Sequence, residues 1–143
     1  MPDAAANAWE ESFVADIRAH GGRPSEGPLK GHPILFMWSV GKKSGERRRS
    51  ILTYSRDGDA FVVAGSKGGS PTDPLWVANV EAHPRVTIEV ANQTFEADGQ
   101  VFAEGPERDR LWRQHVAELP WFGKYEEQTS RTIPTVRLVP VAK

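Results

Sequence analysis

Apolar and polar residues alternate along the first half of the chain in a pattern that predicts strands joined by short hairpins. The apolar run Ile34–Val40 contains Phe and Trp, which is typical of a strand buried on both faces. Gly41–Glu46 follows as a polar hairpin loop, and Arg47–Ser55 alternates as the return strand. The turn Arg56-Asp57-Gly58-Asp59 then leads into a third strand, Ala60–Ala64.

A second hairpin is predicted in the later half of the chain. Arg85–Val90 and Thr94–Phe102 both alternate, and Ala91-Asn92 between them supplies the turn. Ile133–Val139 is a last strand, and Pro134 within it indicates a strand start or a sheet edge. Because hairpin-linked strands are antiparallel, this pattern favours an antiparallel sheet over a doubly wound one.

Helices are predicted to be few and peripheral. Trp9, Phe13 and Ile17 recur at intervals of four and indicate an N-terminal helix over Asp3–His20. A second helix is predicted to begin with Asp73 as N-cap and Pro74 in the first turn and to end near Ala82. The remaining helical predictions are Glu107–Leu119 and a short helix within Trp121–Arg131. We therefore expect a mainly β fold, a small β-barrel with peripheral helices. We expect one domain over residues 1–143, with an N-terminal helix at 1–22 and barrel and lid at 34–140.

Composition narrows the chemistry. The chain has no cysteine, which excludes disulfides, thiolate nucleophiles and thiolate metal sites. The four histidines are not paired at ligand spacing, so no metal site is predicted. No run reaches the ~20 apolar residues of a membrane helix, and the N-terminus does not resemble a signal peptide. We expect a cytoplasmic protein. The N-terminal helix is interpreted as packing on the domain, and the alternatives are that it covers a site or makes peripheral contact with the inner membrane face.

Positive charge is concentrated in one loop although the net charge is −1. The hairpin loop and the strand after it carry Lys42, Lys43, Arg47, Arg48 and Arg49. A second loop, Ser66-Lys67-Gly68-Gly69, directly precedes a helix N-terminus, where backbone N–H groups attract anions. We predict that the two loops hold one elongated anionic cofactor. The alternatives are a solvated charge run and a nucleic-acid patch, and the second is disfavoured because no exposed aromatics are interleaved with the charges.

An aromatic segment, Trp121, Phe122 and Tyr125, follows the helix-breaking Pro120. It is interpreted either as a cap on the core or as one wall of an apolar pocket. Burying a ring of ~150–250 Å² contributes roughly 4–6 kcal/mol before entropy costs, whereas an exposed ion pair contributes about 0–1 kcal/mol. Tight binding therefore requires a flat ring as well as a charged tail. Without thiols or a metal site, an oxidoreductase of this sequence needs a cofactor to carry the electrons.

An ordered set of short motifs is similar to the deazaflavin-dependent nitroreductase family, whose members are split β-barrels that bind coenzyme F420. The resemblance covers about residues 34–140. It rests on Gly41-Lys42-Lys43-Ser44-Gly45 with Arg48, Arg56-Asp57-Gly58, Ser66-Lys67-Gly68-Gly69, Pro74-Leu75-Trp76 with Asn79, His83-Pro84, and Thr129-Ser130-Arg131-Thr132-Ile133-Pro134.

The resemblance implies a reductase that transfers a hydride from F420H2 to an electron-poor apolar acceptor: a quinone, an unsaturated lactone or a nitroaromatic. Cofactor-binding residues carried over are Lys42, Lys43, Ser44, Gly45, Arg48, Ser50, Ser66, Lys67, Gly68, Leu75, Trp76 and Asn79. A hydroxyl from Ser66, Tyr54 or Tyr125 is predicted to deliver the proton that follows the hydride.

The chain departs from the family pattern where the substrate would sit. At the strand position where the family pattern has tyrosine, this sequence has Thr53 followed by Tyr54. The tyrosine-rich wall is replaced by Phe122 and Gln128, with Tyr125 retained. The expected partner is therefore a small molecule, a bulky apolar acceptor. The protein itself is expected to be a monomer or a homodimer. The alternatives are an FMN-dependent oxidoreductase on the same barrel and a non-enzymatic carrier of an apolar ligand.

Overall fold

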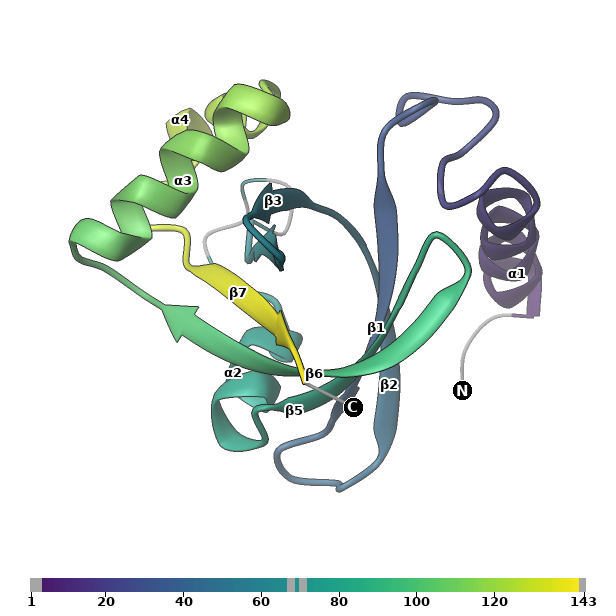
Figure 1. The fold of residues 1–143 in the computed structure, drawn as a ribbon, viewed down its shortest axis with the longest axis horizontal. Helices are drawn as coiled ribbons and strands as arrows, with labels where there is room; N and C mark the ends of the chain where they lie inside the picture. The colour runs from purple at the N-terminus through teal and green to yellow at the C-terminus, as the bar shows by residue number, and fades with distance from the viewer. Residues whose placement is uncertain (1–3, 67–68, 70–71, 142–143) are drawn as a thin grey trace.

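A computed structural model of the chain describes residues 4–66, 69 and 72–141, without the side chains of residues 4–7. It combines one curled sheet with helices packed around it (Figure 1). The strands are β1 Ile34–Val40, β2 Arg47–Thr53, β3 Ser55–Asp57, β4 Ala60–Ala64, β5 Arg85–Val90, β6 Gln93–Phe102 and β7 Thr135–Pro140. The helices are α1 Ala4–Ala19, α2 Leu75–Ala82, α3 Pro106–Glu118 and α4 Phe122–Gln128.

The strands that the structure describes form one seven-stranded sheet in the order β2-β1-β5-β6-β7-β4-β3, and every pair is antiparallel. The predicted hairpins are confirmed. The β5–β6 turn uses Ala91 and Asn92 with φ of 49° and 68°, the left-handed conformation that a two-residue hairpin turn requires. The mainly β, split-barrel architecture expected from the sequence is therefore confirmed.

The predicted continuous strand Arg47–Ser55 is wrong. The chain leaves strand conformation at Tyr54, and the two halves, β2 and β3, lie at opposite edges of the sheet. The Tyr54 N–H donates to the carbonyl of Pro33 at 3.4 Å instead of to a neighbouring strand. Because one bend in a continuous segment places its two halves at both edges, the sheet is curled into a half-barrel.

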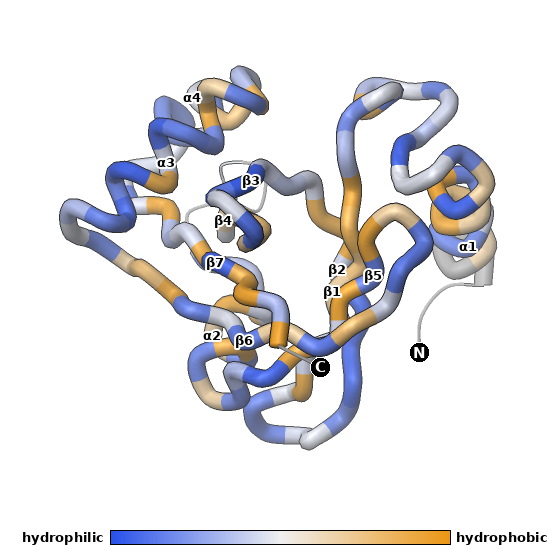
Figure 2. Tube along the Cα trace, viewed as in Figure 1, coloured by the Kyte–Doolittle hydropathy of each residue, from blue (hydrophilic) through white to orange (hydrophobic). Residues whose placement is uncertain are grey.

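The core lies inside the curl, where β1, β5, β6 and β7 face α2. Its most enclosed side chains include Leu35, Val80, Ile88 and Leu138, each fully buried. On the outer face of β1, Val14 and Ile17 of α1 pack against Ile34 and Phe36. In the hydropathy view the apolar segments gather on the strands, and α1 lies against them from outside (Figure 2). Because β1 carries apolar side chains on both faces and each face is covered, the strand is almost wholly buried.

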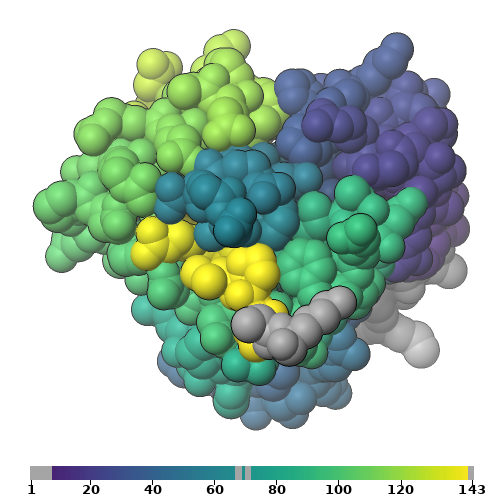
Figure 3. Space-filling model, in the orientation of Figure 1, coloured from purple at the N-terminus to yellow at the C-terminus, as the bar shows by residue number. Residues whose placement is uncertain are grey.

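A second small core holds α3 and α4 against the end of β4. It consists of Ala64, Trp112, Leu119, Phe122 and Ile133. In the space-filling view α3 and α4 form one flank of the molecule, while α1 and the loop after it form the opposite flank (Figure 3). The helices after β6 are thereby fixed beside the open edge of the half-barrel.

The predicted capping of α2 is wrong in one respect. Pro74, with φ −65° and ψ 150°, occupies the N-cap position, and no side chain caps the helix. Asp73 instead forms an ion pair with Arg131 at 2.6 Å. The extended backbone at Pro74 places the Asp73 side chain outside the first turn, so its carboxylate is available to a distant partner. The helix ends at Ala82, as predicted, with His83 at the C-cap.

Candidate cofactor and substrate site

The β1–β2 loop has a defined shape because its glycines allow close contacts. The Gly41 N–H donates to the Glu46 carbonyl at 2.7 Å, and the Gly45 N–H donates to the Gly41 carbonyl at 2.9 Å. A Cβ at Gly41 would lie 2.4 Å from the Ser44 hydroxyl oxygen. That hydroxyl in turn accepts from the Glu46 N–H at 3.2 Å. The loop therefore needs glycine at position 41 to hold Ser44 in place.

Asn79 of α2 fixes the other side of this loop. Its buried side-chain oxygen accepts from the Lys42 backbone N–H at 2.9 Å. The side chains of Lys42 and Lys43 remain exposed. Asn79 thus holds the loop through its backbone. The ammonium groups of Lys42 and Lys43 therefore remain available to an anion.

The arginines of β2 point to opposite faces of the sheet. Arg48 lies beside the loop, with only a long 3.8 Å contact to Glu46. Arg49 reaches the other face, where α1 supplies Glu10 at 3.1 Å and Glu11 at 2.5 Å. The Arg47 guanidinium lies over the ring of Trp38 at 5.9 Å. Arg48 lines two neighbouring cavities beside the basic loop, whereas Arg49 lines only one of them and has the shorter ion pairs.

Three cavities adjoin one another along α2. The basic cavity, about 440 Å³, is lined by Gly41, Lys42, Lys43, Ser44, Arg48, Leu75, Ala78 and Asn79. The middle cavity, about 380 Å³, shares Arg48, Leu75 and Asn79 with it. The aromatic cavity, also about 380 Å³, shares Ser50, Pro74 and Trp76 with the middle one. Because neighbouring cavities share lining residues, the three follow one another as a track from a basic end to an aromatic end.

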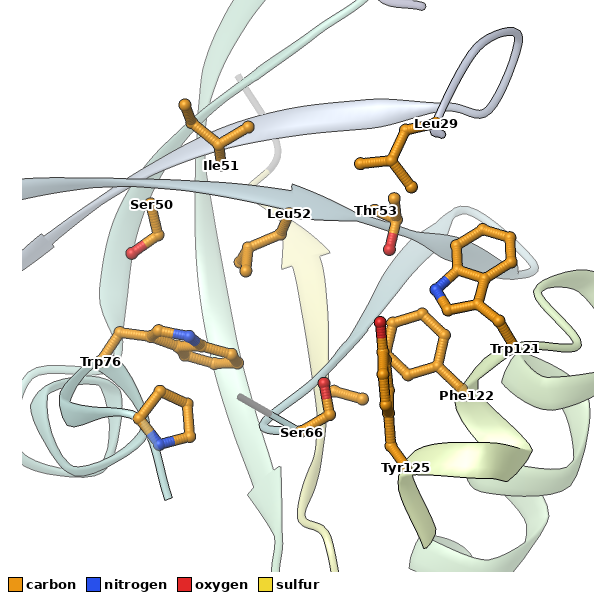
Figure 4. A pocket seen from close by; sticks show the side chains of 12 residues that line it. Leu29, Ser50, Ile51, Leu52, Thr53, Ser66, Trp76, Trp121, Phe122 and Tyr125 are labelled. Carbon is orange, nitrogen blue, oxygen red and sulfur yellow. The ribbon is translucent and has the colours of Figure 1, made fainter. Parts of the chain in front are cut away.

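The aromatic cavity brings together segments that are distant in sequence. Ser50, Leu52 and Thr53 of β2 form one side, and Trp76, Ser66 and Tyr125 lie across from them (Figure 4). Leu29 and Trp121 stand at one end of the cavity. The ring of His32 contacts Trp121 edge-on with centroids 4.6 Å apart, which connects the loop before β1 to α4. Flat rings and a few hydroxyls therefore surround a space that suits a planar ligand.

The loop between β4 and α2 places Ser66 in this wall. Ser66 is buried, and the carbonyls of Gly65 and Ser66 accept from Arg131 at 3.0 and 2.9 Å. The predicted site residues Lys67 and Gly68 lie outside the described residues. Gly69 is described, with φ +82°.

The three residues predicted as proton donors do not all line the same cavity. Ser66 and Tyr125 line the aromatic cavity, whereas Tyr54 is absent from its lining. The partly buried Tyr54 ring packs edge-on against Phe61 at 5.3 Å, at the margin of the core. Burial raises the pKa of its hydroxyl, so it stays protonated at neutral pH. Thr53, which precedes Tyr54, and Ser50 supply hydroxyls from β2 to the cavity.

A buried histidine lies behind the aromatic wall. His115 of α3 is fully enclosed, and its Nδ1 is 2.7 Å from the Ser55 hydroxyl oxygen. Phe122 covers it edge-on at 4.4 Å. Burial lowers the pKa of His115 to about 4, so the ring is neutral at neutral pH. Because no described cavity reaches it, His115 belongs to the framework of the site and not to its chemistry.

Sequence reasoning missed Leu29, His32 and Arg131 as parts of the site. Leu29 and His32 stand in an irregular Gly- and Pro-rich segment with no periodicity, so nothing in the sequence relates them to Trp121. Arg131 was part of a motif but had no assigned role. Among the described residues no cluster of histidine and carboxylate side chains could hold a metal ion, and no helix is long and apolar enough to cross a membrane.

Comparison with known proteins identifies similar sequences and folds. A sequence model of the family described as F420H2-dependent quinone reductase matches residues 9–140. An F420H2-dependent quinone reductase of Mycobacterium tuberculosis H37Rv is 39% identical over 109 residues, covering 74% of this chain and 72% of the relative. An F420H2-dependent quinone reductase of Mycobacterium tuberculosis CDC 1551 has the same identity and coverage.

Solved structures agree on the fold. The chain is similar to an F420-H2 dependent reductase, FDR-A, with a TM-score of 0.67 and 30% identity, covering 74% of this chain and 93% of that one. It is also similar to a protein described as a domain-swapped dimer, with a TM-score of 0.69 and 26% identity over 93% of this chain and 98% of that one. A pyridoxamine 5′-phosphate oxidase-like protein of Listeria innocua, 13% identical with a TM-score of 0.55, shares the fold alone.

Proposed function

Because the chain belongs to the F420H2-dependent quinone reductase family, we propose that its three adjoining cavities hold the reduced deazaflavin and that a quinone is the acceptor. The observation that carries the proposal is the continuity of the track, which is aromatic at one end and basic at the other. A cofactor with a flat ring and an anionic tail matches this polarity along its length.

The basic end would hold the phosphate and the acidic tail. Lys42, Lys43 and Arg48 supply three cations there, and the Ser44 hydroxyl lies between them in the same loop. Several cations acting together are needed, since each exposed pair contributes about 0–1 kcal/mol. Gly45, Lys67 and Gly68 remain predicted members of this site on the motif alone.

The aromatic end would hold the ring and the acceptor. Trp76 and Ser50 line the boundary between the middle and aromatic cavities, where a ring would enter. When bound, the reduced deazaflavin supplies the hydride. The chain's part is to hold the ring against the acceptor, to exclude water with Trp121, Phe122 and Leu29, and to donate a proton. The Ser66 and Tyr125 hydroxyls face this space and are the proposed donors.

A quinone fits this arrangement better than a more polar acceptor does. The cavity wall is mostly apolar, and its polar groups are neutral hydroxyls and indole N–H groups that can bind carbonyl oxygens. The names of the relatives point to the same acceptor class. Unsaturated lactones share a ring carbonyl and are the second candidate class, followed by nitroaromatics.

The test has two stages. Oxidised F420 and FMN are titrated separately into the purified protein, and saturable binding of F420 is expected. Binding of FMN alone would contradict the proposal, and binding of neither would favour a carrier. Stopped-flow oxidation of bound F420H2 is then followed against a naphthoquinone, a coumarin and a nitroimidazole, with the quinone expected to react fastest.

The proton donors are tested by matched hydroxyl deletions. Ser66→Ala and Tyr125→Phe are expected to slow quinone reduction, whereas Tyr54→Phe serves as the control because its ring packs against Phe61 and does not line the cavity. If Ser66→Ala and Tyr125→Phe both turn over like the wild type, the proton comes from another source and this assignment is wrong.

A further inference from the structure

Arg131 lies between α4 and β7, far in sequence from the loop that it holds. Its side chain is mostly enclosed, at 16% exposed. Nη2 donates to two successive carbonyls, Gly65 at 3.0 Å and Ser66 at 2.9 Å. Nη1 donates to the Asp73 carboxylate at 2.6 Å. One guanidinium therefore binds both ends of the segment between β4 and α2.

These two carbonyls determine the direction of the Ser66 side chain. The Gly65 carbonyl belongs to the peptide plane before the Ser66 Cα, and the Ser66 carbonyl belongs to the plane after it. Since each peptide unit is planar, fixing both planes fixes φ and ψ of Ser66. The Cα–Cβ direction follows from those two angles. Arg131, whose guanidinium binds these two carbonyls and the Asp73 carboxylate, thereby sets the Cα–Cβ axis from which the Ser66 hydroxyl reaches the aromatic cavity.

A second contact joins the same loop to α4. The Gly69 N–H also donates to the Ser66 carbonyl, at 2.9 Å. A Cβ at Gly69 would lie 2.6 Å from the Gln128 side-chain oxygen and 3.3 Å from the Tyr125 carbonyl, so the loop and the helix are in close contact there. The supports of Ser66 and Tyr125, the two hydroxyls proposed above, therefore meet at this contact.

The chemistry of this contact requires an arginine. The guanidinium is planar and presents five N–H donors in a fixed fork, which lets one side chain bind two carbonyls and a carboxylate at set angles. A lysine ammonium carries the same charge but has three freely rotating donors on a single atom. Replacing arginine by lysine thus keeps the charge and removes the geometry.

We infer that Arg131 is a positioning residue that aims the Ser66 hydroxyl into the aromatic cavity, with Asp73 orienting the guanidinium. The inference rests on the proposed function of that cavity, because it assigns to Arg131 an effect on ligand and rate that passes through Ser66. Arg131 has no proposed contact with the reacting atoms.

A double-mutant cycle tests this. Arg131→Lys is made in the wild type and in Ser66→Ala, and the Kd of oxidised F420 and the rate of F420H2 oxidation by a quinone are measured for all four proteins. Lost charge-assisted hydrogen bonds predict a change of about tenfold in at least one of the two quantities in the wild-type background. The same substitution is expected to change that quantity less than about twofold when Ser66 is already alanine.

The controls separate positioning from stability. Arg113→Lys, an exposed change on α3, is expected to behave as the wild type. If Arg131→Lys fails to fold, Asp73→Asn carries the same cycle, because it leaves the guanidinium in place and removes its charged partner. An equal effect of the substitution with and without Ser66 would mean a general structural role. That result would overturn this inference and leave the proposed function standing. A wild-type protein that does not bind F420 would overturn the proposed function as well.

Discussion

Asn79 shows how one buried amide shapes an exposed loop. Its oxygen accepts the Lys42 N–H, and Lys42 and Asn79 both line the basic cavity. Asn79→Ala leaves that N–H without its partner and frees the loop, so we expect the Kd for F420 to rise about tenfold, equivalent to the ~1–2 kcal/mol of such a bond. Fluorescence titration measures the change, and Glu81→Ala, exposed on the same helix, is the control. Equal affinities of the two variants would contradict the role of Asn79.

His115 predicts how stability depends on pH. Its folded pKa of about 4 lies below the ordinary value of 6.5, because burial disfavours the charged ring. The folded state therefore binds fewer protons, and its stability is complete above pH 6.5 and falls as the pH drops from 6.5 towards 4. Multiplying the difference by 1.36 kcal/mol per pKa unit gives a loss of about 3 kcal/mol.

Urea denaturation at pH 7.5, 6, 5 and 4.5 measures this loss. His115→Asn keeps a side-chain nitrogen or oxygen within reach of Ser55 but does not titrate, so its slope between pH 6.5 and 4.5 is expected to be shallower. The carboxylate of Asp57 affects stability only at lower pH. The guanidinium groups of Arg110 and Arg137 lower the pKa of Asp57 below 3.8, and its contribution is lost only as the pH falls below that value. Parallel slopes for the wild type and His115→Asn would exclude the histidine as the cause.

At the level of elements, α1 is held to the sheet chiefly by burial. Ile17 is 1% exposed against β1, while its neighbour Arg18 forms an ion pair with Glu89 at 2.9 Å and is 45% exposed. Ile17→Ala is expected to lower the free energy of unfolding by about 2–4 kcal/mol. Arg18→Gln is expected to lower it by about 1 kcal/mol or less. Chemical denaturation compares the two, and a larger loss for Arg18→Gln would show that the ion pair dominates.

Elements with strong local patterns could be predicted from the sequence, and the bend between them could not. The alternation that predicts β1, β5 and β6 arises from residues whose faces differ in polarity. Tyr54 has the side chain of a strand residue, and only the closing of the sheet moves its N–H to Pro33. The predicted N-cap Asp73 fails for a related reason, since a partner 58 residues away, Arg131, engages its carboxylate.

The candidate site follows the same division. Lys42, Lys43, Ser44 and Arg48 occur close together in sequence, and they line one cavity. Leu29, Thr53, Ser66 and Trp121 come from separate elements, and it is the half-barrel that brings them into one wall. Local composition can therefore indicate a basic loop, whereas the shape of the aromatic cavity depends on long-range packing that a single sequence does not encode locally.

On the scale of the whole molecule, the two ends of the track differ in charge although the net charge is −1. The basic end has the exposed residues Lys42, Lys43 and Arg48, and the residues described at the aromatic end are all neutral. Exposed charges are screened over about 8–10 Å at physiological salt, whereas burial of an aromatic ring is nearly independent of it. Salt should therefore weaken the binding of the anionic cofactor tail and leave the binding of the acceptor almost unchanged.

We expect the Kd for F420 to rise about tenfold between 50 and 500 mM NaCl, while the KM for the quinone, measured at saturating F420H2, changes less than about twofold. Removing one cation, as in Arg48→Gln, should raise the Kd at low salt and flatten its dependence on salt, since fewer charges remain to be screened. Arg113→Gln, exposed on α3 and away from the track, should leave the slope unchanged. A Kd that is insensitive to salt, or a slope that is equal in Arg48→Gln and the wild type, would mean that the anionic tail lies elsewhere. The division of the site into a basic end for the tail and an aromatic end for the reaction would then have to be abandoned.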